Sequence, residues 1–365
     1  MNTVVVTGAA GSIGSRVVET LLGRDDVHKV VGIDLLRCEA RHPKLLAIVA
    51  DLSELGSSDY ARLVSAIEGN ASMVNLAWAA GDTMGLDSQD RPLVGAANSR
   101  STRAVLEVAA RCAAGSIVHV SSATVYGAWA DNDVPLSEES RILPNPELPF
   151  AVAKAETERI IAEWSDLHRS VPVAVMRPAV TVGSGDRPLY QALEATRTPL
   201  VAQPDRLVQY LHVDDLVSAV VLAWERRLDG VFNVAPDSGI SEGEARRLVG
   251  GIAKVGMPGR LASTLSILGW KLGRRGVPPE ALAYATHPWV VSPDRLVSLG
   301  WSPAYSSAEA LVETDEKWHW DDLPPGKRQN FNTVVALTAA GSVLALVSAL
   351  FVSRRRRTNR PARHS

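Results

Sequence analysis

Residues 3–14 read TVVVTGAAGSIG, a short apolar run that leads directly into a glycine-rich turn. The run Thr3–Thr7 predicts a buried strand because its apolar residues are consecutive, and Ser12–Leu22 has the pattern of a helix. Glycines between a strand and a helix allow a tight turn and a close approach of the backbone to a phosphate, which the helix N-terminus stabilises. The predicted phosphate-binding residues are Gly8, Ala10, Gly11, Ser12, Ile13 and Gly14.

A carboxylate ends the next predicted strand, Lys29–Asp34, twenty residues beyond Gly14. Asp34 can accept hydrogen bonds from both hydroxyl groups of a ribose and would repel a 2′-phosphate. The turn and the carboxylate together predict a site for NAD, and NADP is less favoured although Arg37 lies nearby in the sequence. The alternative is a purely structural turn in which Asp34 caps a strand.

Short apolar runs and longer helical patterns alternate through the first half of the chain. The further predicted strands are Leu45–Ala50, Ser72–Ala77, Ser116–Ser121 and Val173–Arg177. The further predicted helices are Tyr60–Glu68, Pro92–Ala113 and Phe150–Arg169. This order predicts an α/β fold, a Rossmann-type doubly wound parallel sheet with helices on both faces.

The pattern changes after Arg177, where glycine and proline become frequent and the apolar runs become shorter. Val208–Val213 predicts a late strand, Asp214–Trp224 the helix after it, and Val231–Val234 another strand. We therefore expect an NAD-binding Rossmann domain over residues 1–178. A smaller substrate-binding lobe, interleaved with the late strands, is expected over residues 179–325.

Composition excludes several classes of protein. The chain has 365 residues with a formal net charge of −2, which gives no electrostatic support for a nucleic-acid partner. Its two cysteines, Cys38 and Cys112, have no metal-ligand spacing, so we expect no metal site. The N-terminus lacks a basic segment followed by an apolar stretch, so we expect no signal peptide and a cytoplasmic globular domain.

The C-terminal region predicts a membrane association. No residue is charged from Gln329 to Ser353, and four consecutive arginines begin the basic tail, residues 354–365. Residues 330–353 are long enough for a single transmembrane helix, and no polar face suggests a buried amphipathic helix instead. The arginines favour a cytoplasmic tail, which conflicts with a cytoplasmic globular domain unless the tail is translocated or the helix lies in the interface.

Further motifs occur in order along the chain. Asp51-Leu52, Asn75-Leu76-Ala77-Trp78, Asn98 and the segment Ser121–Gly127 (SSATVYG) follow the predicted strands. With the glycine turn, they resemble the extended short-chain dehydrogenase/reductase (SDR) family in its epimerase/dehydratase branch, over roughly Thr3 to Trp320. The resemblance implies an NAD-binding Rossmann fold, a homodimer, and cofactor contacts from Asp51, Leu52, Ala77, Asn98 and Lys154. Trp78 stands where the family has a small residue.

The resemblance also implies a catalytic site, from which one group is missing. Ser122 matches the hydroxyl that holds the substrate oxygen, and Lys154 matches the lysine that holds the nicotinamide ribose and lowers the pKa of a catalytic tyrosine. The position of that tyrosine is Phe150, which has no ionisable proton. Tyr126, His119 and His212 are interpreted as structural residues. Arg187 and Arg206 are either anion ligands or, as is usual for exposed arginines, solvated surface residues.

Two kinds of function remain open from the sequence. The first is an NAD-dependent epimerase/dehydratase or dehydrogenase with a small-molecule substrate. Val180 stands where nucleotide-sugar enzymes often carry an asparagine, so both a nucleotide sugar and an apolar, sterol-like alcohol stay candidates. The second is a catalytically silent, membrane-anchored protein that binds the dinucleotide as a sensor or scaffold.

Overall fold

The computed structural model describes residues 2–67, 69–78, 91–183, 205–248 and 281–314. All of these belong to one compact unit, Met1–Thr314. The predicted membrane helix at 330–353, the basic tail and Arg187 lie outside the described residues. Within the described part of the chain, no helix has the length and apolar character needed to span a bilayer. The division at residue 178 stays a prediction.

A seven-stranded sheet forms the centre of the described residues, in the order β10-β6-β5-β4-β1-β2-β3. Each pair of neighbouring strands is parallel. The strands are β1 (Asn2–Thr7), β2 (Val27–Asp34), β3 (Leu45–Val49), β4 (Ser72–Asn75), β5 (Ser116–Val120), β6 (Val173–Pro178) and β10 (Gly230–Val234). The predicted doubly wound Rossmann sheet is confirmed, and the strand order reverses between β1 and β4.

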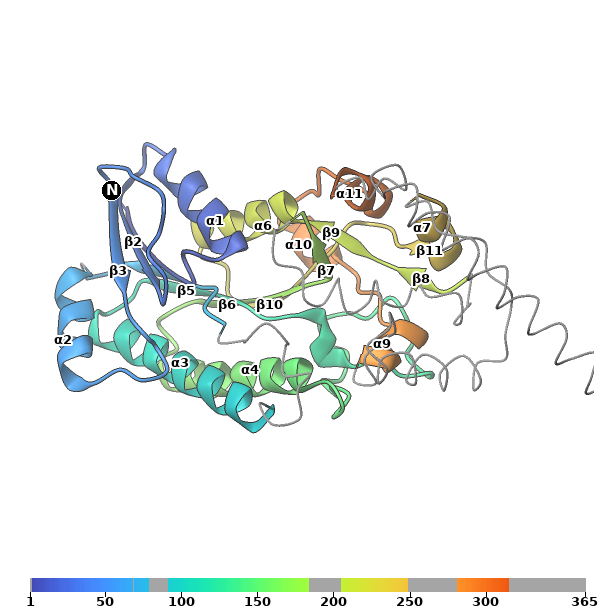
Figure 1. Ribbon diagram of the computed structural model, residues 1–365, viewed down its shortest axis with the longest axis horizontal. Coiled ribbons are helices and arrows are strands. Elements are labelled where there is room, and N and C mark those ends of the chain that lie inside the picture. The colour runs from blue at the N-terminus through green and yellow to red at the C-terminus, as the bar shows by residue number, and fades with distance from the viewer. Residues whose placement is uncertain (1, 68, 79–90, 184–204, 249–280, 315–365) are drawn as a thin grey trace, which may run out of the picture. The chain divides into compact units, whose positions relative to one another are not determined.

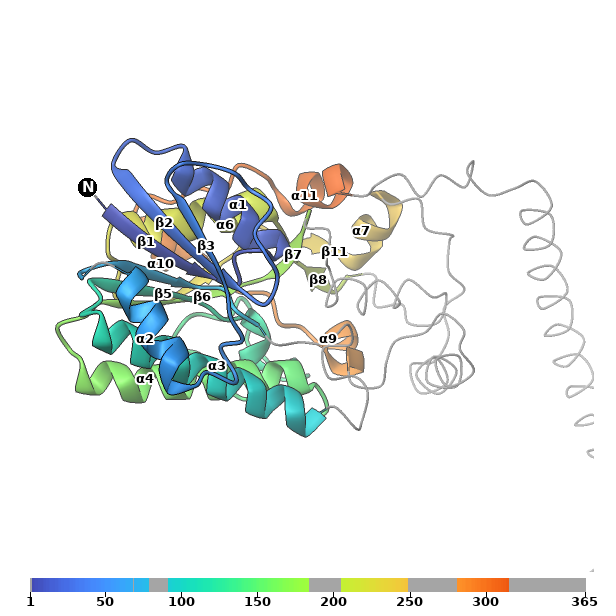
Figure 2. The same cartoon turned by 60° about the vertical axis from the view of Figure 1, so that its left-hand side comes forward.

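Helices cover both faces of the sheet (Figures 1 and 2). On one side lie α1 (Ser12–Leu22) and α6 (Val213–Glu225), and on the other α2 (Ser57–Ala66), α3 (Arg91–Arg111) and α4 (Pro149–Leu167). Side chains of a strand alternate between the faces. Val4 and Val6 therefore pack in the core that includes α1 and α6, whereas Val5 packs in the core that includes α2 and α3. Burial on both sides explains why an inner strand such as β1 is continuously apolar.

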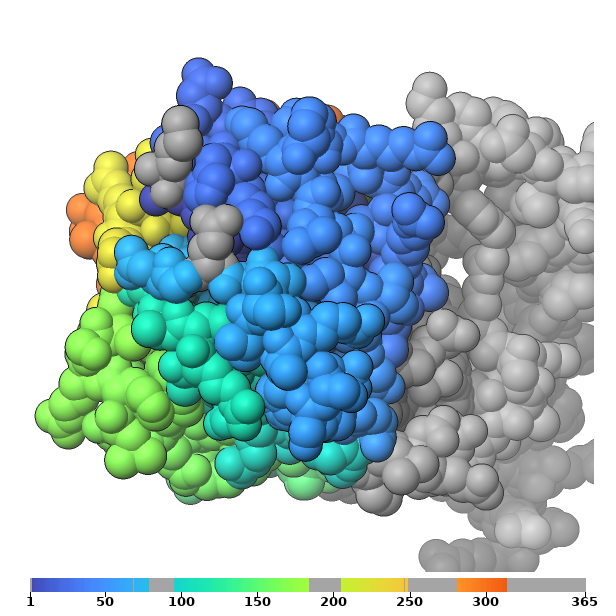
Figure 3. All heavy atoms as spheres, turned by 90° about the vertical axis from the view of Figure 1, so that its left-hand side faces the viewer, coloured from blue at the N-terminus to red at the C-terminus, as the bar shows by residue number. Residues whose placement is uncertain are grey.

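Short elements gather beyond the carboxyl ends of the central strands (Figure 1). They include η1 (Ala123–Tyr126), a parallel pair of β7 (Val180–Val182) with β9 (Tyr210–His212), and an antiparallel pair of β8 (Leu207–Val208) with β11 (Ile240–Ser241). The remaining short helices are α7 (Glu242–Leu248), α9 (Leu282–Thr286), α10 (Asp294–Ser298) and α11 (Ser307–Thr314). The opposite side of the molecule, toward the amino ends of the strands, shows the segment from β2 to α2 in blue and α4 in green (Figure 3).

The prediction of one strand over Val208–Val213 is wrong, because two strands and a helix start divide that segment. Gln209 separates the strands. Its buried amide donates to the carbonyl of Val291 at 2.9 Å and accepts from the N–H of the same residue at 2.8 Å. His212 then ends β9 and caps α6, since its Nδ1 accepts from the N–H of Asp214 at 3.2 Å. The structural interpretation of His212 is thus confirmed.

A buried ion pair joins α4 to β6. The Arg177 guanidinium donates to both carboxylate oxygens of Glu158, at distances from 2.6 to 3.1 Å, and to the hydroxyl of Tyr126 at 2.8 Å. The Tyr126 hydroxyl donates in turn to Oδ1 of Asn233 at 2.8 Å. Every member is buried, and burial raises the pKa of Tyr126. Tyr126 therefore has the structural role that its motif suggested.

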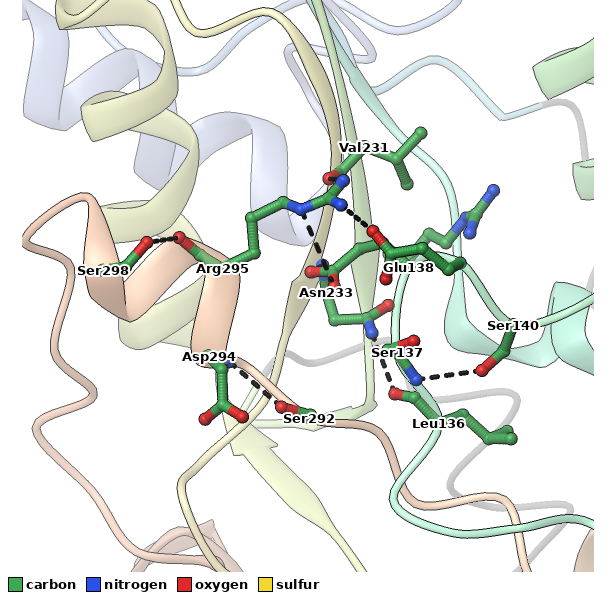
Figure 4. A network of polar contacts seen from close by, with 12 residues as sticks. Leu136, Ser137, Glu138, Ser140, Val231, Asn233, Ser292, Asp294, Arg295 and Ser298 are labelled. Atoms are coloured by element: carbon green, nitrogen blue, oxygen red, sulfur yellow. Dashed lines mark hydrogen bonds and ion pairs between the residues drawn. The ribbon is translucent and has the colours of Figure 1, made fainter.

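Polar side chains close the outer edge of β10 (Figure 4). Glu138 accepts from the backbone N–H of Asn233 at 2.8 Å, and Arg295 of α10 donates to the carbonyl of Val231 at 3.1 Å. Arg295 also pairs with Glu138 across 4.0 Å, and the Asn233 amide donates to the carbonyl of Leu136 at 3.1 Å. An edge strand with free backbone groups invites pairing with another chain. These contacts instead fix the segment after η1 to the sheet.

Candidate functional site

The glycine turn packs backbone against backbone at the carboxyl ends of β1 and β4. Gly8 has a φ of +70°, and a Cβ placed on it would lie 2.8 Å from backbone atoms of Leu76 and Ala77. A Cβ on Gly14 would lie 1.9 Å from the carbonyl oxygen of Gly8. Any side chain at these two positions would push the first turn of α1 away from the sheet. The turn therefore lies where the strand order reverses, which is where open α/β sheets bind ligands.

The N-terminus of α1 presents backbone donors. Gly11 is the N-cap and has no side chain with which to cap the first turn, and its own N–H donates to the carbonyl of Gly8 at 3.1 Å. The first N–H groups of a helix have no partner within the helix, so those of Ser12 and Ile13 suit an anion. Gly11 is exposed, and Ser12 and Ile13 are half-buried, which leaves room for a phosphate to approach.

Asp34 contacts the turn directly. Its Oδ2 accepts from the backbone N–H of Ala10 at 2.9 Å, and its Oδ1 accepts from the N–H of Leu36 at 3.1 Å. The carboxylate that would bind the ribose hydroxyls thus lies beside the residues that would bind the pyrophosphate. Arg37, the residue that kept NADP open, is exposed. The glycine turn, the uncapped helix start and the adjacent carboxylate fit an adenine dinucleotide.

The other predicted cofactor residues lie in the following segments. Ala77 lies against Gly8, and its N–H donates to the hydroxyl of Thr7 at 3.3 Å. Leu52 is buried, whereas Asp51 is exposed and accepts from the N–H of Ser53 at 2.8 Å. Asn98 is buried on α3. The structure brings Ala77, Asp34 and the glycine turn together directly.

A line of buried polar contacts crosses the sheet beneath the turn. The Thr7 hydroxyl donates to Oδ1 of Asn75 at 2.7 Å, and Nδ2 of Asn75 lies 3.1 Å from Nδ1 of His119. Nε2 of His119 is 3.5 Å from the hydroxyl of Thr157 on α4. Burial and then the charge of Lys154 hold the pKa of His119 well below its usual value. His119 is therefore neutral and structural, as its strand position predicted.

Ser122 and Lys154 are buried at the ends of neighbouring elements. The hydroxyl oxygen of Ser122 caps η1, because it accepts from the N–H of Thr124 at 3.2 Å and from the hydroxyl of Thr124 at 3.0 Å. Nζ of Lys154 donates to the carbonyl of Val120 at 2.9 Å. Ser122 follows Val120 by two residues, so β5 brings the hydroxyl and the ammonium to the same end of the sheet.

Two aromatic rings surround the Lys154 ammonium. The centroid of the Trp78 ring lies 4.2 Å from Nζ, and that of Phe150 lies 5.8 Å from it. The rings meet edge to face, with centroids 5.0 Å apart and planes at 69°. Burial lowers the pKa of Lys154 to about 7, although the Glu158 carboxylate acts in the opposite direction. Phe150 thus faces the site but offers it no exchangeable proton.

Sequence reasoning missed the role of Trp78 and the surroundings of Arg206. The sequence shows a tryptophan at position 78, where the family has a small residue, but it does not show that Trp78 contacts Lys154. The side chain of Arg206 is 7% exposed and donates to Glu242 at 3.3 Å and to the carbonyl of Tyr284 at 3.2 Å. It stabilises the short elements after the sheet, so its guanidinium is already paired and does not act as a free anion ligand.

Comparison with known proteins agrees with this geometry. The pattern of the "NAD dependent epimerase/dehydratase family" matches residues 4–235, so the chain belongs to that family. A UDP-glucose 4-epimerase of Azospirillum brasilense is 28% identical over 343 residues, which cover 86% of this chain and 91% of the relative.

Solved structures have the same fold. A crystal structure of UDP-galactose 4-epimerase has a TM-score of 0.59 and 25% identity, covering 86% of this chain and 97% of that one. The UDP-glucose 4-epimerase of Thermus thermophilus, solved in complex with NAD, has a TM-score of 0.62 and 21% identity over the same shares of the two chains. The predicted family and fold are confirmed.

The burial of Lys154 predicts a pH dependence of stability. A lysine with a folded-state pKa near 7 binds fewer protons than the unfolded chain between pH 7 and about 10.4, so stability rises with pH across that window. The cost of burying the ammonium is fully present below pH 7. We expect the free energy of unfolding of wild type, relative to Lys154→Met, to rise by about 2–3 kcal/mol from pH 7 to 9.5.

Chemical denaturation at the two pH values measures this difference. Lys154→Arg is the matched control, because its charge does not titrate in this range, and it should lack the rise as Lys154→Met does. Parallel pH profiles for wild type and both variants would contradict a buried, titrating amine at this position.

Proposed function

We propose that the chain binds NAD in the crevice beside Gly8 and uses it to transfer hydride at a hydroxyl-bearing carbon of a nucleotide sugar. The observation that carries the proposal is the hydrogen bond between Asp34 and the N–H of Ala10. It joins a ribose-recognising carboxylate to a phosphate-binding turn, which is the minimal arrangement for an adenine dinucleotide. Membership of the NAD dependent epimerase/dehydratase family supports the same cofactor.

Different residues bind different parts of the dinucleotide and the substrate. The N–H groups of Ser12 and Ile13 hold the pyrophosphate, and the Asp34 carboxylate accepts the adenosine ribose hydroxyls. Lys154 holds the second ribose, and Ser122 donates a hydrogen bond to the substrate oxygen. NAD, when bound, supplies the hydride acceptor. The covering of the Lys154 ammonium by protein atoms excludes water from this part of the crevice.

The relatives favour a nucleotide sugar over a sterol-like alcohol as the substrate. Several of them, including the Azospirillum brasilense protein and a dTDP-glucose 4,6-dehydratase of Streptomyces niveus, are named for reactions of nucleotide sugars. Val180, which raised the alternative, is buried in β7 and packs in the core. Its apolar character is therefore explained by packing and needs no apolar substrate.

A second function is favoured by Phe150. A general acid or base contributes about 10²–10⁴-fold to such a reaction, and the aromatic ring at 150 cannot serve as one. A chain that binds the dinucleotide without turnover, as a sensor or scaffold, is therefore the alternative. A homodimer also stays a prediction.

Isothermal titration calorimetry tests the cofactor. We expect NAD to bind at least tenfold more tightly than NADP, because Asp34 repels a 2′-phosphate. Asp34→Asn should weaken NAD binding and reduce the preference for NAD about tenfold. Asp166→Asn is the control, since Asp166 is an exposed carboxylate near the far end of α4, and it should change neither affinity. Equal affinity of wild type for both cofactors, or no binding, would refute the assignment.

A tyrosine hydroxyl restored at position 150 distinguishes an enzyme from a protein that binds NAD without catalysis. With NAD and UDP-glucose as the probe substrate, Phe150→Tyr should raise turnover at least about 100-fold over wild type, since it returns the proton donor beside Lys154. Phe150→Leu lacks an ionisable group and should show no gain. If Phe150→Tyr binds NAD as wild type does and still gains no activity, the catalytic proposal fails and the silent alternative stands.

We also propose that residues 330–353 anchor the chain to a membrane, with the globular unit in the cytoplasm. The absence of charge from Gln329 to Ser353 supports this, together with the arginines that follow. The full chain should float with vesicles that contain anionic lipid in a density gradient, and a chain lacking residues 327–365 should not. Equal flotation of the two would show that the anchor lies elsewhere.

A further inference from the structure

Trp78 links the segment beside the glycine turn to Lys154 of α4. It follows Ala77, whose backbone is packed against Gly8, and its indole reaches Lys154 on α4. In the family resemblance this position carries a small residue, so the contact is a property of this chain.

The contact is strong enough to compete with a ligand. A cation over the face of tryptophan is stabilised more when it is desolvated than at an exposed site. Lys154 is 6% exposed, so its ammonium is largely desolvated. Its Nζ has one described acceptor, the carbonyl of Val120, and the Trp78 ring covers a second direction.

The described contacts of the Trp78 indole are made by its ring, and its N–H makes no described hydrogen bond. Nε1 of Trp78 is buried and has no acceptor among the described residues. A buried donor without a partner lowers stability, because it has lost its hydrogen bonds to water. The ring stays in place through Lys154 and through its edge-to-face contact with Phe150. Because the indole N–H makes no hydrogen bond with the described residues, a ligand that offers Lys154 better acceptors can displace the ring without breaking such a bond.

We propose that Trp78 is a gate on Lys154, and that its indole occupies the place on the ammonium that the second ribose of a dinucleotide must take. This inference rests on the proposed binding of NAD. The adenosine and phosphate groups bind at the glycine turn with the gate closed. The second ribose reaches Lys154 only when the indole moves away, and the lost cation–π contact weakens binding of that half.

The affinities of ADP and NAD distinguish binding at the glycine turn from binding of the second ribose at Lys154, because ADP lacks the second ribose. In wild type, full-length chain in detergent, NAD should bind little more tightly than ADP. Trp78→Ala should raise the ratio of NAD to ADP affinity about tenfold, with the affinity for ADP unchanged within about twofold. A tenfold change corresponds to about 1.4 kcal/mol, within the range for one cation–π contact.

Two variants control for the loss of an aromatic residue. Trp164→Ala removes a tryptophan that stacks on His168 near the other end of α4, and it should leave the ratio as in wild type. Trp78→Phe keeps a ring over the ammonium and should give an intermediate ratio, so the inference stays testable if Trp78→Ala does not fold. NAD, but not ADP, should also change the tryptophan fluorescence of wild type more than that of Trp78→Phe.

The ADP and NAD affinities show whether Trp78 blocks the second ribose or contributes to binding it. If both ligands bind and Trp78→Ala leaves the ratio unchanged or lowers it, the indole is part of the binding wall and the gate is refuted while NAD binding stands. If neither ligand binds to wild type or to the variants, the proposed cofactor fails and the gate fails with it.

Discussion

The close approach of Gly8 to the backbone of Leu76 and Ala77 is the constraint on which the site depends. It requires a glycine with positive φ and fixes the end of β1 against the end of β4, at the place where the strand order reverses. The first turn of α1 is then set by Gly14, whose Cα lies against the carbonyl of Gly8. The uncapped helix start and the place of Asp34 beside Ala10 both follow from this packing.

Two buried cations lie at α4, and their surroundings differ: Lys154 belongs to the helix, and Arg177 reaches it from β6. Arg177 is fully paired with Glu158 and Tyr126, and breaking such a pair leaves an uncompensated charge. Among the described residues, the Lys154 ammonium has one carbonyl acceptor and two aromatic rings around it. Arg177 therefore stabilises the fold through a complete set of acceptors, whereas the hydrogen bonding of Lys154 within these residues is incomplete.

Much of the fold could be predicted because its inner strands, such as β1, β5 and β6, are buried on both faces and are largely continuous apolar runs. The segment 208–213 failed for a physical reason. Its apolar residues suggested one strand, but Gln209 turns a buried amide toward Val291, more than eighty residues away in sequence, and that contact ends the pairing. Arg206 likewise could not be assigned from its neighbours, since Glu242 and Tyr284, which neutralise and bury it, belong to distant segments.

By itself the sequence determined what is covalent or local: the glycine turn between a strand and a helix, a carboxylate at residue 34, and the absence of a hydroxyl at residue 150. These depend on residue identity and on spacing within one or two elements. Only the tertiary structure decided that Trp78 covers the ammonium of Lys154 and that Asp34 bonds to Ala10. Such contacts depend on how β4 and α4, or β1 and β2, are set against one another, and no local pattern contains that register.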